Sequence, residues 1–143
     1  MRAMGVDLGT KRIGIAISDF SGTIASPHSV IQRGKSKRLD YQRIKDIVIE
    51  EEVEIVVVGL PLAMSGAQNS AARAATAEAR HLATVLSVPV EMFDERLTTV
   101  AADRVLREAD ISASARRQYV DKVAAAILLQ SWLEQRRSNS VET

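Results

Sequence analysis

The chain is predicted to fold as an α/β protein in which helices flank a mixed β-sheet, and three observations predict this class. Strand-like runs rich in β-branched residues fill residues 6–30. The apolar run VEIVVVGLPL is typical of a strand buried on both faces in a parallel part of a sheet. Segments with helical spacing alternate with the later strands, which indicates helices packed against the sheet.

The first part of the chain is expected to form three antiparallel strands and a helix. The strands are MGVD, then RIGIAIS after the turn LGTK, and TIASPHSVI after the turn FSG. The basic loop QRGKSKR follows them. In LDYQRIKDIVIEEE the apolar residues lie close to helical spacing, so this segment is the first predicted helix.

The second part continues with a buried strand in VEIVVVGLPL, an alanine-rich helix in QNSAARAATAEARHLATVL and a short strand in VPVEMF. Another helix is predicted from Thr98, with Thr98 or Thr99 as N-cap, through Ala109. In the last helix Asp121 lies at the edge of the apolar stripe, so it can face a cleft while its neighbours face the core.

Composition limits the possible function classes without choosing one. The 143 residues predict a single domain over residues 1–137, followed by a polar, disordered tail over residues 138–143. Nineteen Lys and Arg against eighteen Asp and Glu leave a net charge of +1, so any basic surface must be local. The absence of cysteine excludes disulfides and thiolate chemistry. The N-terminus has no signal-peptide pattern, and we expect a cytoplasmic protein.

Acidic residues stand where two predicted strands end. Asp7 closes the first strand, and Asp94 and Glu95 close VPVEMF. Sites in mixed α/β sheets form at the carboxyl ends of strands. Because side chains alternate, only one of Asp94 and Glu95 can point to a given face, and the sequence leaves open which one is the ligand. Asp121 offers a third acid from the last helix.

Three converging carboxylates favour a hard divalent cation, Mg²⁺ or Mn²⁺, because carboxylates repel one another until a cation neutralises them. Ions in two-metal sites lie about 3.5–4 Å apart and promote hydrolysis of phosphodiesters. Simpler interpretations exist for each acid: a turn cap for Asp7, a salt bridge with Arg96 for Glu95, and an exposed acid near Arg117 for Asp121.

Four segments, VDLGTKRIGIAISD, GLPLAMSG, DERLTT and DKVAAAILLQSWL, occur in the order and spacing of one bacterial family. The sequence resembles the YqgF/RuvX family, whose members are described as Holliday-junction-resolvase-like and as nucleases that mature the 5′ end of pre-16S ribosomal RNA. The resemblance covers nearly the whole chain. It implies an RNase H-like, mixed five-stranded sheet flanked by helices and a metal-dependent nuclease that uses Mg²⁺ or Mn²⁺.

By this resemblance Asp7, Glu95 and Asp121 are the catalytic and metal-binding residues. Many RNase H-like nucleases carry their second acid at the end of the fourth strand. Here that strand runs into Gly59 and Leu60, so Glu95 is expected to replace it from the following strand.

Basic and hydroxyl side chains near these acids are predicted to contact nucleic acid. For the basic loop QRGKSKR, however, a solvated run of charges is the commoner interpretation. The predicted contacts are Thr10, Lys11, Arg12, Arg33, Lys35, Lys37, Arg38, Arg96, Arg116 and Arg117. The loop GLPLAMSG is expected either to form a rim over the cleft or to be structural.

The expected partner is nucleic acid, either pre-16S ribosomal RNA or branched DNA, with the ribosome as a further candidate. A four-way-junction resolvase would have to be a homodimer to cut two strands symmetrically, whereas RNA processing is open to a monomer. Two other classes stay open. The segment DLGT also resembles the phosphate-binding turn of the actin and sugar-kinase group, and a non-catalytic RNA-binding or ribosome-binding protein would keep the acids as relics.

Overall fold

In a computed structural model, the backbone is described for residues 1–63, 65–97 and 113–142, and the side chains for residues 1–63, 65–97 and 122–139. The elements are β1 (Ala3–Leu8), β2 (Arg12–Ser18), β3 (Ala25–Gln32), α1 (Lys37–Glu50), β4 (Ile55–Leu60), α2 (Ser70–Val85), β5 (Val90–Asp94), the 3-10 turn η1 (Glu95–Leu97) and α4 (Ala113–Glu142). The helix predicted from Thr98 to Ala109 lies outside the described residues.

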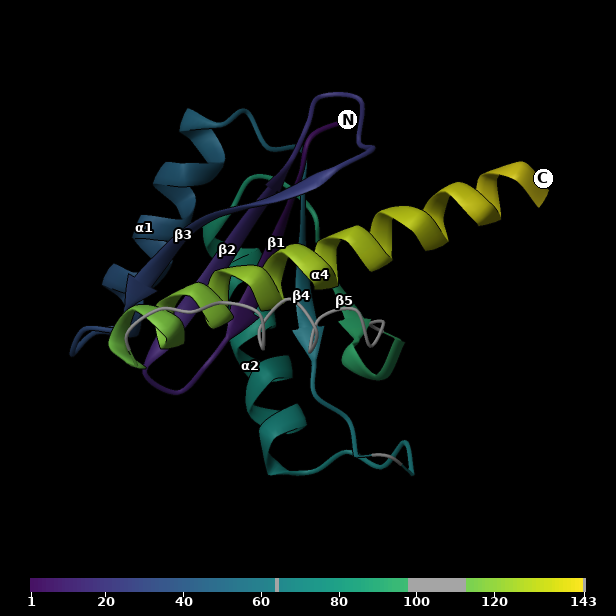
Figure 1. The fold of residues 1–143 in the computed structure, drawn as a ribbon. Coiled ribbons are helices and arrows are strands. Elements are labelled where there is room, and N and C mark those ends of the chain that lie inside the picture. The colour runs from purple at the N-terminus through teal and green to yellow at the C-terminus, as the bar shows by residue number, and fades with distance from the viewer. Residues whose placement is uncertain (64, 98–112, 143) are drawn as a thin grey trace.

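The five strands form one mixed sheet in the order β3-β2-β1-β4-β5. Strand β2 pairs antiparallel with both β1 and β3, and β4 pairs parallel with both β1 and β5. This arrangement confirms the predicted mixed sheet, including the antiparallel start. The carboxyl ends of β1, β4 and β5 therefore share one edge of the sheet (Figure 1).

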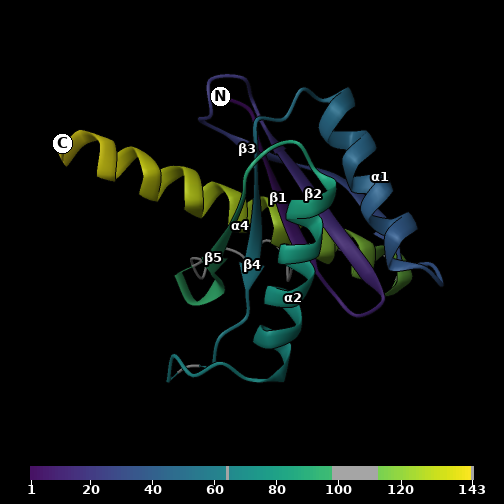
Figure 2. The same ribbon diagram turned by 180° about the vertical axis from the view of Figure 1, so that it is seen from behind.

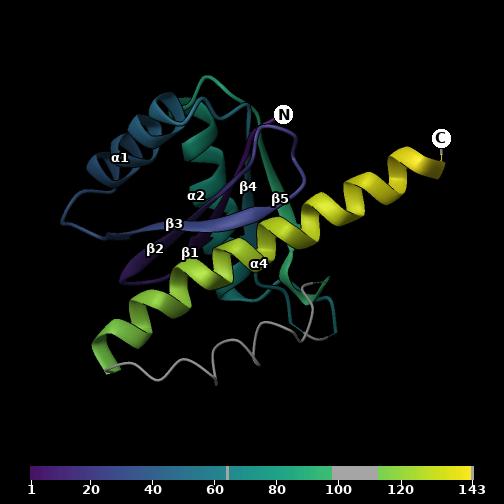
Figure 3. The same ribbon diagram turned by 45° about the horizontal axis from the view of Figure 1, so that its top comes forward.

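Helices cover the two faces of the sheet unequally (Figures 2 and 3). Helices α1 and α2 cover one face, where Ile44 and Leu82 pack with Val6 and Val58 in one core cluster. Helix α4 crosses the other face, and its residues form a second cluster with Ala3, Ala16, Ile55, Val57 and Phe93. Strand alternation divides the two clusters, because residues two apart on a strand share a face.

Helix α4 lies very close to the central strand. A Cβ atom added to Gly5 of β1 would stand 2.7 Å from the carbonyl oxygen of Ala125, so only glycine allows this approach. After Leu133, the last residue of α4 in the second cluster, the helix extends beyond the sheet (Figure 1), and residues 134–139 are exposed.

Helix α4 runs to Glu142 and so includes most of the polar segment predicted as a disordered tail. This segment contains neither Gly nor Pro, the residues that most often end a helix. No described helix is both long and apolar enough to cross a membrane.

Candidate functional site

The turn between β1 and β2 is tight because glycine occupies its first position. The Gly9 amide donates a hydrogen bond to the carbonyl oxygen of Arg12 at 2.9 Å. A Cβ on Gly9 would stand 2.6 Å from that oxygen. The turn brings the exposed residues Thr10 and Lys11 to the sheet edge beside Asp7, which is partly buried.

Asp7 and Gly59 occupy equivalent positions on neighbouring parallel strands. Strands β1 and β4 are in register from Ala3 opposite Ile55 to Val6 opposite Val58. One further step along each strand puts Asp7 beside Gly59, about 4.8 Å away in the direction of the backbone hydrogen bonds. Both positions belong to the face covered by α4, because Gly5 and Val57 two residues earlier pack there.

The carboxylate of Glu95 lies against the bare backbone of Gly59. A Cβ added to Gly59 would collide with Oε1 of Glu95 and would stand 3.1 Å from its Cδ. Burial raises the pKa of Glu95, and the negative charge of neighbouring Asp94 raises it further. The missing side chain on β4 therefore makes room for an acid that comes from the end of β5.

Arg96 distinguishes the two adjacent acids. Its Nε donates to both carboxylate oxygens of Asp94 at 3.0 Å, and its Nη2 donates to Oδ2 at 2.6 Å. Hydrogen bonds from Arg96 lower the pKa of Asp94. The same guanidinium reaches the loop after β4, where a Cβ on Gly66 would lie 3.4 Å from Nη1. Asp94 thus anchors an arginine, whereas Glu95 reaches the end of β4.

Helix α4 runs opposite to β1 across this face. A Cβ on Gly22 would lie 2.9 Å from the carbonyl oxygen of Met1 and 3.9 Å from Leu133, whereas Ala125 of α4 lies over Gly5. Asp121, one turn before Ala125, therefore belongs to the part of α4 that continues toward the carboxyl end of β1. The side chains of Asp121, Arg116 and Arg117 lie outside the described residues, and the described side chains alone form no cluster of three metal-ligating groups.

Arg33, one of the predicted nucleic-acid contacts, is bound inside the protein. Its guanidinium forms a paired ion bridge with Glu78 of α2, with distances of 2.7 and 2.8 Å, and its Nε donates to the carbonyl oxygen of Gly9 at 2.8 Å. The Tyr41 hydroxyl of α1 also donates to Glu78, at 2.6 Å. Both charged side chains are only 12% exposed. This cluster, Arg33, Glu78 and Tyr41, connects the β3–α1 loop, α1, α2 and the β1–β2 turn.

Partner contacts shift the pKa values of this cluster. Burial alone would raise the pKa of Glu78, but hydrogen bonds from Arg33 and Tyr41 outweigh it and lower the pKa. The Glu78 hydrogen bond raises the pKa of Arg33, and burial raises that of Tyr41. No local pattern in the sequence indicates this cluster, because Arg33 and Glu78 are 45 positions apart.

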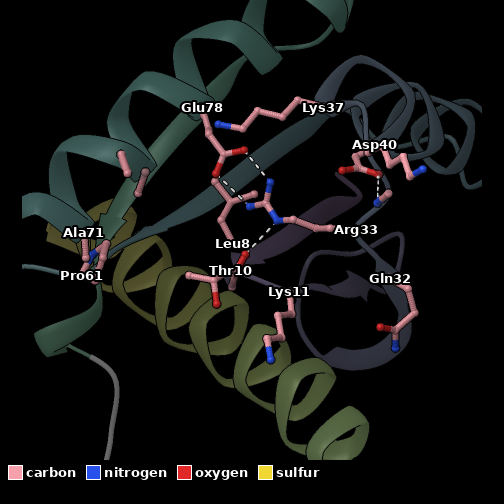
Figure 4. A pocket seen from close by; sticks show the side chains of 15 residues that line it. Leu8, Thr10, Lys11, Gln32, Arg33, Lys37, Asp40, Pro61, Ala71 and Glu78 are labelled. Atoms are coloured by element: carbon pink, nitrogen blue, oxygen red, sulfur yellow. Dashed lines mark hydrogen bonds and ion pairs between the residues drawn. The ribbon is translucent and has the colours of Figure 1, made fainter.

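A pocket of about 760 Å³ opens between α1, α2 and the β1–β2 turn (Figure 4). It lies on the side of the sheet away from α4, because Glu78 and Asp40 in its wall belong to α2 and α1. The predicted contacts Thr10, Lys11, Lys35 and Lys37 line it together with Arg33. Arg12 at the start of β2 and Arg38 in α1 are not among its lining residues.

Residues 1–135 match the model of a protein family described as RuvX, Holliday junction resolvase. A protein of Moorella thermoacetica is 48% identical over 141 residues, which cover 99% of this chain and all of that protein. A protein of Thermoanaerobacter pseudethanolicus is 45% identical over 139 residues, covering 96% of this chain and 99% of the relative. Both relatives carry the provisional name pre-16S rRNA nuclease.

The fold is also found in a solved resolvase structure. RuvC of Thermus thermophilus, solved in complex with a Holliday junction substrate, superposes with a TM-score of 0.61 over 96% of each chain. Only 14% of the aligned residues are identical, so this similarity concerns the fold. It confirms the predicted RNase H-like architecture.

Proposed function

The chain belongs to the RuvX family, and from this membership we propose that it is a metal-dependent nuclease that hydrolyses phosphodiester bonds in structured nucleic acid. Pre-16S ribosomal RNA is the proposed substrate, because relatives with this provisional name align over nearly their whole length at 45–48% identity. A nuclease that processes this precursor would work in the cytoplasm, where the ribosome is its candidate partner.

The observation that supports the catalytic assignment is that two acids, Asp7 and Glu95, both lie next to Gly59. Asp7 stands beside Gly59 by strand register, and the Glu95 carboxylate occupies the space that a side chain at this position would fill. A metal-dependent nuclease needs carboxylates that lie close together, and this arrangement brings two of them to one face of the sheet. Asp121 is the proposed third acid, from the helix that covers the same face.

The donor set fits Mg²⁺ or Mn²⁺. Carboxylate oxygens are the ligands that these ions prefer. Burial and a neighbouring acid raise the pKa of Glu95, so a bound cation would strongly stabilise the ionised form of this carboxylate. Asp7, Glu95 and Asp121 would hold the metal. When bound, such ions activate water and stabilise the leaving oxygen of a phosphodiester.

The chain's own groups would position the nucleic acid beside these acids. Thr10 and Lys11 lie in the turn after β1, and Arg12 begins β2, so backbone amides and cations can hold a substrate phosphate near Asp7. Arg96 lies next to Glu95 and beside the loop at Gly66. Arg116 and Arg117 precede Asp121 in α4 and are proposed to approach the substrate from the helix side.

Resolution of four-way DNA junctions is the second candidate function. The family description and the fold shared with a junction-bound RuvC favour it. It requires a homodimer with two sites related by a two-fold axis, whereas RNA processing does not. The mass of the protein in solution, measured with and without a junction, therefore adds a second test.

The function is tested by incubating the purified protein with 5′-extended 16S precursor RNA and, separately, with a four-way DNA junction, each in Mg²⁺ or Mn²⁺. We expect cleavage of the RNA that leaves a 5′-phosphate and disappears in Asp7→Asn. Cleavage of the junction alone would assign resolvase activity instead. Binding of RNA without cleavage of either substrate would contradict the nuclease proposal and indicate a ribosome-associated binding protein.

A further inference from the structure

The pocket between α1 and α2 has two chemically different ends. One end is basic, with Lys11, Lys35 and Lys37 in its wall. These three lysines are exposed, and none forms an ion pair with the described residues. The other end is apolar, with Pro61 and Ala71 on the side away from Lys11 and Lys37 (Figure 4). Its ligand should therefore combine an anionic group with an apolar body.

The charges in the pocket wall are fixed before any ligand arrives. Arg33 and Glu78 neutralise each other, and Arg33 also holds the carbonyl oxygen of Gly9. The three lysines therefore provide the positive charge for an anionic ligand. The carboxylate of Glu78 already accepts hydrogen bonds from Arg33 and Tyr41. A wall held by such a buried ion pair is preorganised, which lowers the cost of ordering it on binding.

Asp40 adds an acceptor to the same wall. It is 1% exposed, and its Oδ1 accepts a hydrogen bond from the Gly34 amide at 3.0 Å. Its buried Oδ2 has no hydrogen-bond partner in the described part of the chain. Buried acceptors normally have a donor, so this oxygen is a polar atom of the wall that the described residues leave unsatisfied.

We infer that this pocket binds one phosphorylated nucleotide unit of the substrate strand, with its phosphate at the lysines and its sugar and base toward the apolar end. A volume of about 760 Å³ greatly exceeds what an isolated phosphate needs. The nature of the strand rests on the proposed nuclease function, whereas binding of a nucleotide unit rests on the pocket itself.

The pocket and the acids are linked by the β1–β2 turn, although they lie on opposite faces of the sheet. Thr10 is three positions after Asp7, which limits the distance between their backbones to about 11 Å. A strand that passes over the turn could therefore place neighbouring nucleotides at the acids and in the pocket. The pocket would hold the strand in register without taking part in the chemistry.

The experiment measures binding without cleavage. The parent is the Asp7→Asn protein in the presence of a chelator, and the probe is a fluorescent single-stranded RNA from the 5′ extension of the precursor. The pocket variant adds Lys35→Ala and Lys37→Ala, and the matched control adds Lys45→Ala, which removes a lysine of α1 that does not line the pocket. Adenosine monophosphate and inorganic phosphate are titrated separately and followed through backbone amide shifts.

We expect the pocket variant to bind the RNA at least about tenfold more weakly than the parent. The slope of log K against log salt concentration should become shallower by about one unit. Lys45→Ala should bind like the parent. Equal affinity of the pocket variant and the parent would overturn the inference. If the monophosphate shifts the pocket amides while RNA affinity is unchanged, the ligand is a free nucleotide and the assignment to the strand is wrong.

Ala74→Phe tests the apolar end with all lysines present. Ala74 is an exposed residue of α2 in the pocket wall, so the larger ring narrows the pocket without entering the core. Severalfold weaker binding of the RNA and the monophosphate, with unchanged binding of inorganic phosphate, is expected. Unchanged binding of all three probes would contradict a nucleoside at this end. Cleavage of the RNA by the protein with an intact Asp7 is measured separately. A failure of the nuclease proposal can therefore be told apart from a failure of the pocket proposal.

Discussion

Two glutamates on opposite faces of the sheet show opposite electrostatic behaviour. Glu78, on the face covered by α1 and α2, accepts hydrogen bonds from Arg33 and Tyr41, and these lower its pKa. Glu95, on the face covered by α4, has a raised pKa because burial and the charge of Asp94 disfavour its ionised form. Hydrogen-bond partners within the fold favour the ionised form of the first acid, whereas burial and a neighbouring negative charge disfavour that form of the second.

The comparison shows that the two faces of one sheet give their glutamates different electrostatic environments. Asp7 faces α4, and Leu8, the next residue, lines the pocket on the other side. Alternation along a strand therefore separates an acidic face from a basic face within a single residue step. The turn at Thr10 and Lys11 is the short connection between them.

The largest effect is expected from Glu95→Gln. Removing a proposed metal ligand should lower cleavage by at least about a hundredfold, since even residues that only orient ligands cost about 10–100-fold. Asp94→Asn is the matched control, and only a severalfold loss is expected because Asp94 binds Arg96. Single-turnover cleavage rates measure both. A larger loss in Asp94→Asn than in Glu95→Gln would reverse the assignment of the two acids.

Breaking the ion pair between Arg33 and Glu78, on the face covered by α1 and α2, should lower the stability of the fold. Arg33→Met leaves the Glu78 charge in a largely buried position, so we expect the free energy of unfolding to fall by about 2–4 kcal/mol. The double variant Arg33→Met/Glu78→Leu should lose less than the sum of the two single variants. Urea unfolding followed by circular dichroism measures all three. Additive losses would show that the two charges are not coupled.

Gly59→Ala tests the space occupied by Glu95. The added methyl group would displace the carboxylate, and we expect a loss of about 1–3 kcal/mol in unfolding free energy together with weaker cleavage. Gly34→Ala is the control, because its Cβ would meet only Oδ1 of Asp40, at 3.7 Å. Thermal unfolding and cleavage assays should separate the two variants. Full activity of Gly59→Ala would contradict the proposed position of Glu95.

The smallest effect concerns pH. Since the pKa of Glu78 is below its ordinary value of 4.5 in the folded state, its contribution to stability is present above pH 4.5 and is lost as the pH falls through the folded pKa. The pH dependence of the Glu95 contribution has the opposite sign. Because the pKa of Glu95 is raised, its contribution to stability is present at low pH and is lost as the pH rises through the folded pKa. Carboxyl NMR titration should show Mg²⁺ lowering the pKa of Glu95 and leaving Glu78 unchanged.

Much of the fold could be predicted because it depends on local patterns. The alternation in RIGIAIS and the continuous apolar run IVVVGL gave β2 and β4 with the expected pairing, since burial on one or two faces is written into neighbouring residues. The different surroundings of Asp94 and Glu95 could not be predicted from the neighbouring residues. They depend on Arg96 and on the space at Gly59, which belongs to a different strand.

The sequence by itself determined the family, the mixed sheet and the acids proposed for catalysis, because these follow from motif order and strand periodicity. The tertiary structure alone decided that Arg33 pairs with Glu78, that Glu95 lies against Gly59, and that Lys11 and Lys35 line one pocket with residues of α2. Each of these contacts joins residues more than 20 positions apart, and only the packing of the helices on the sheet brings them together.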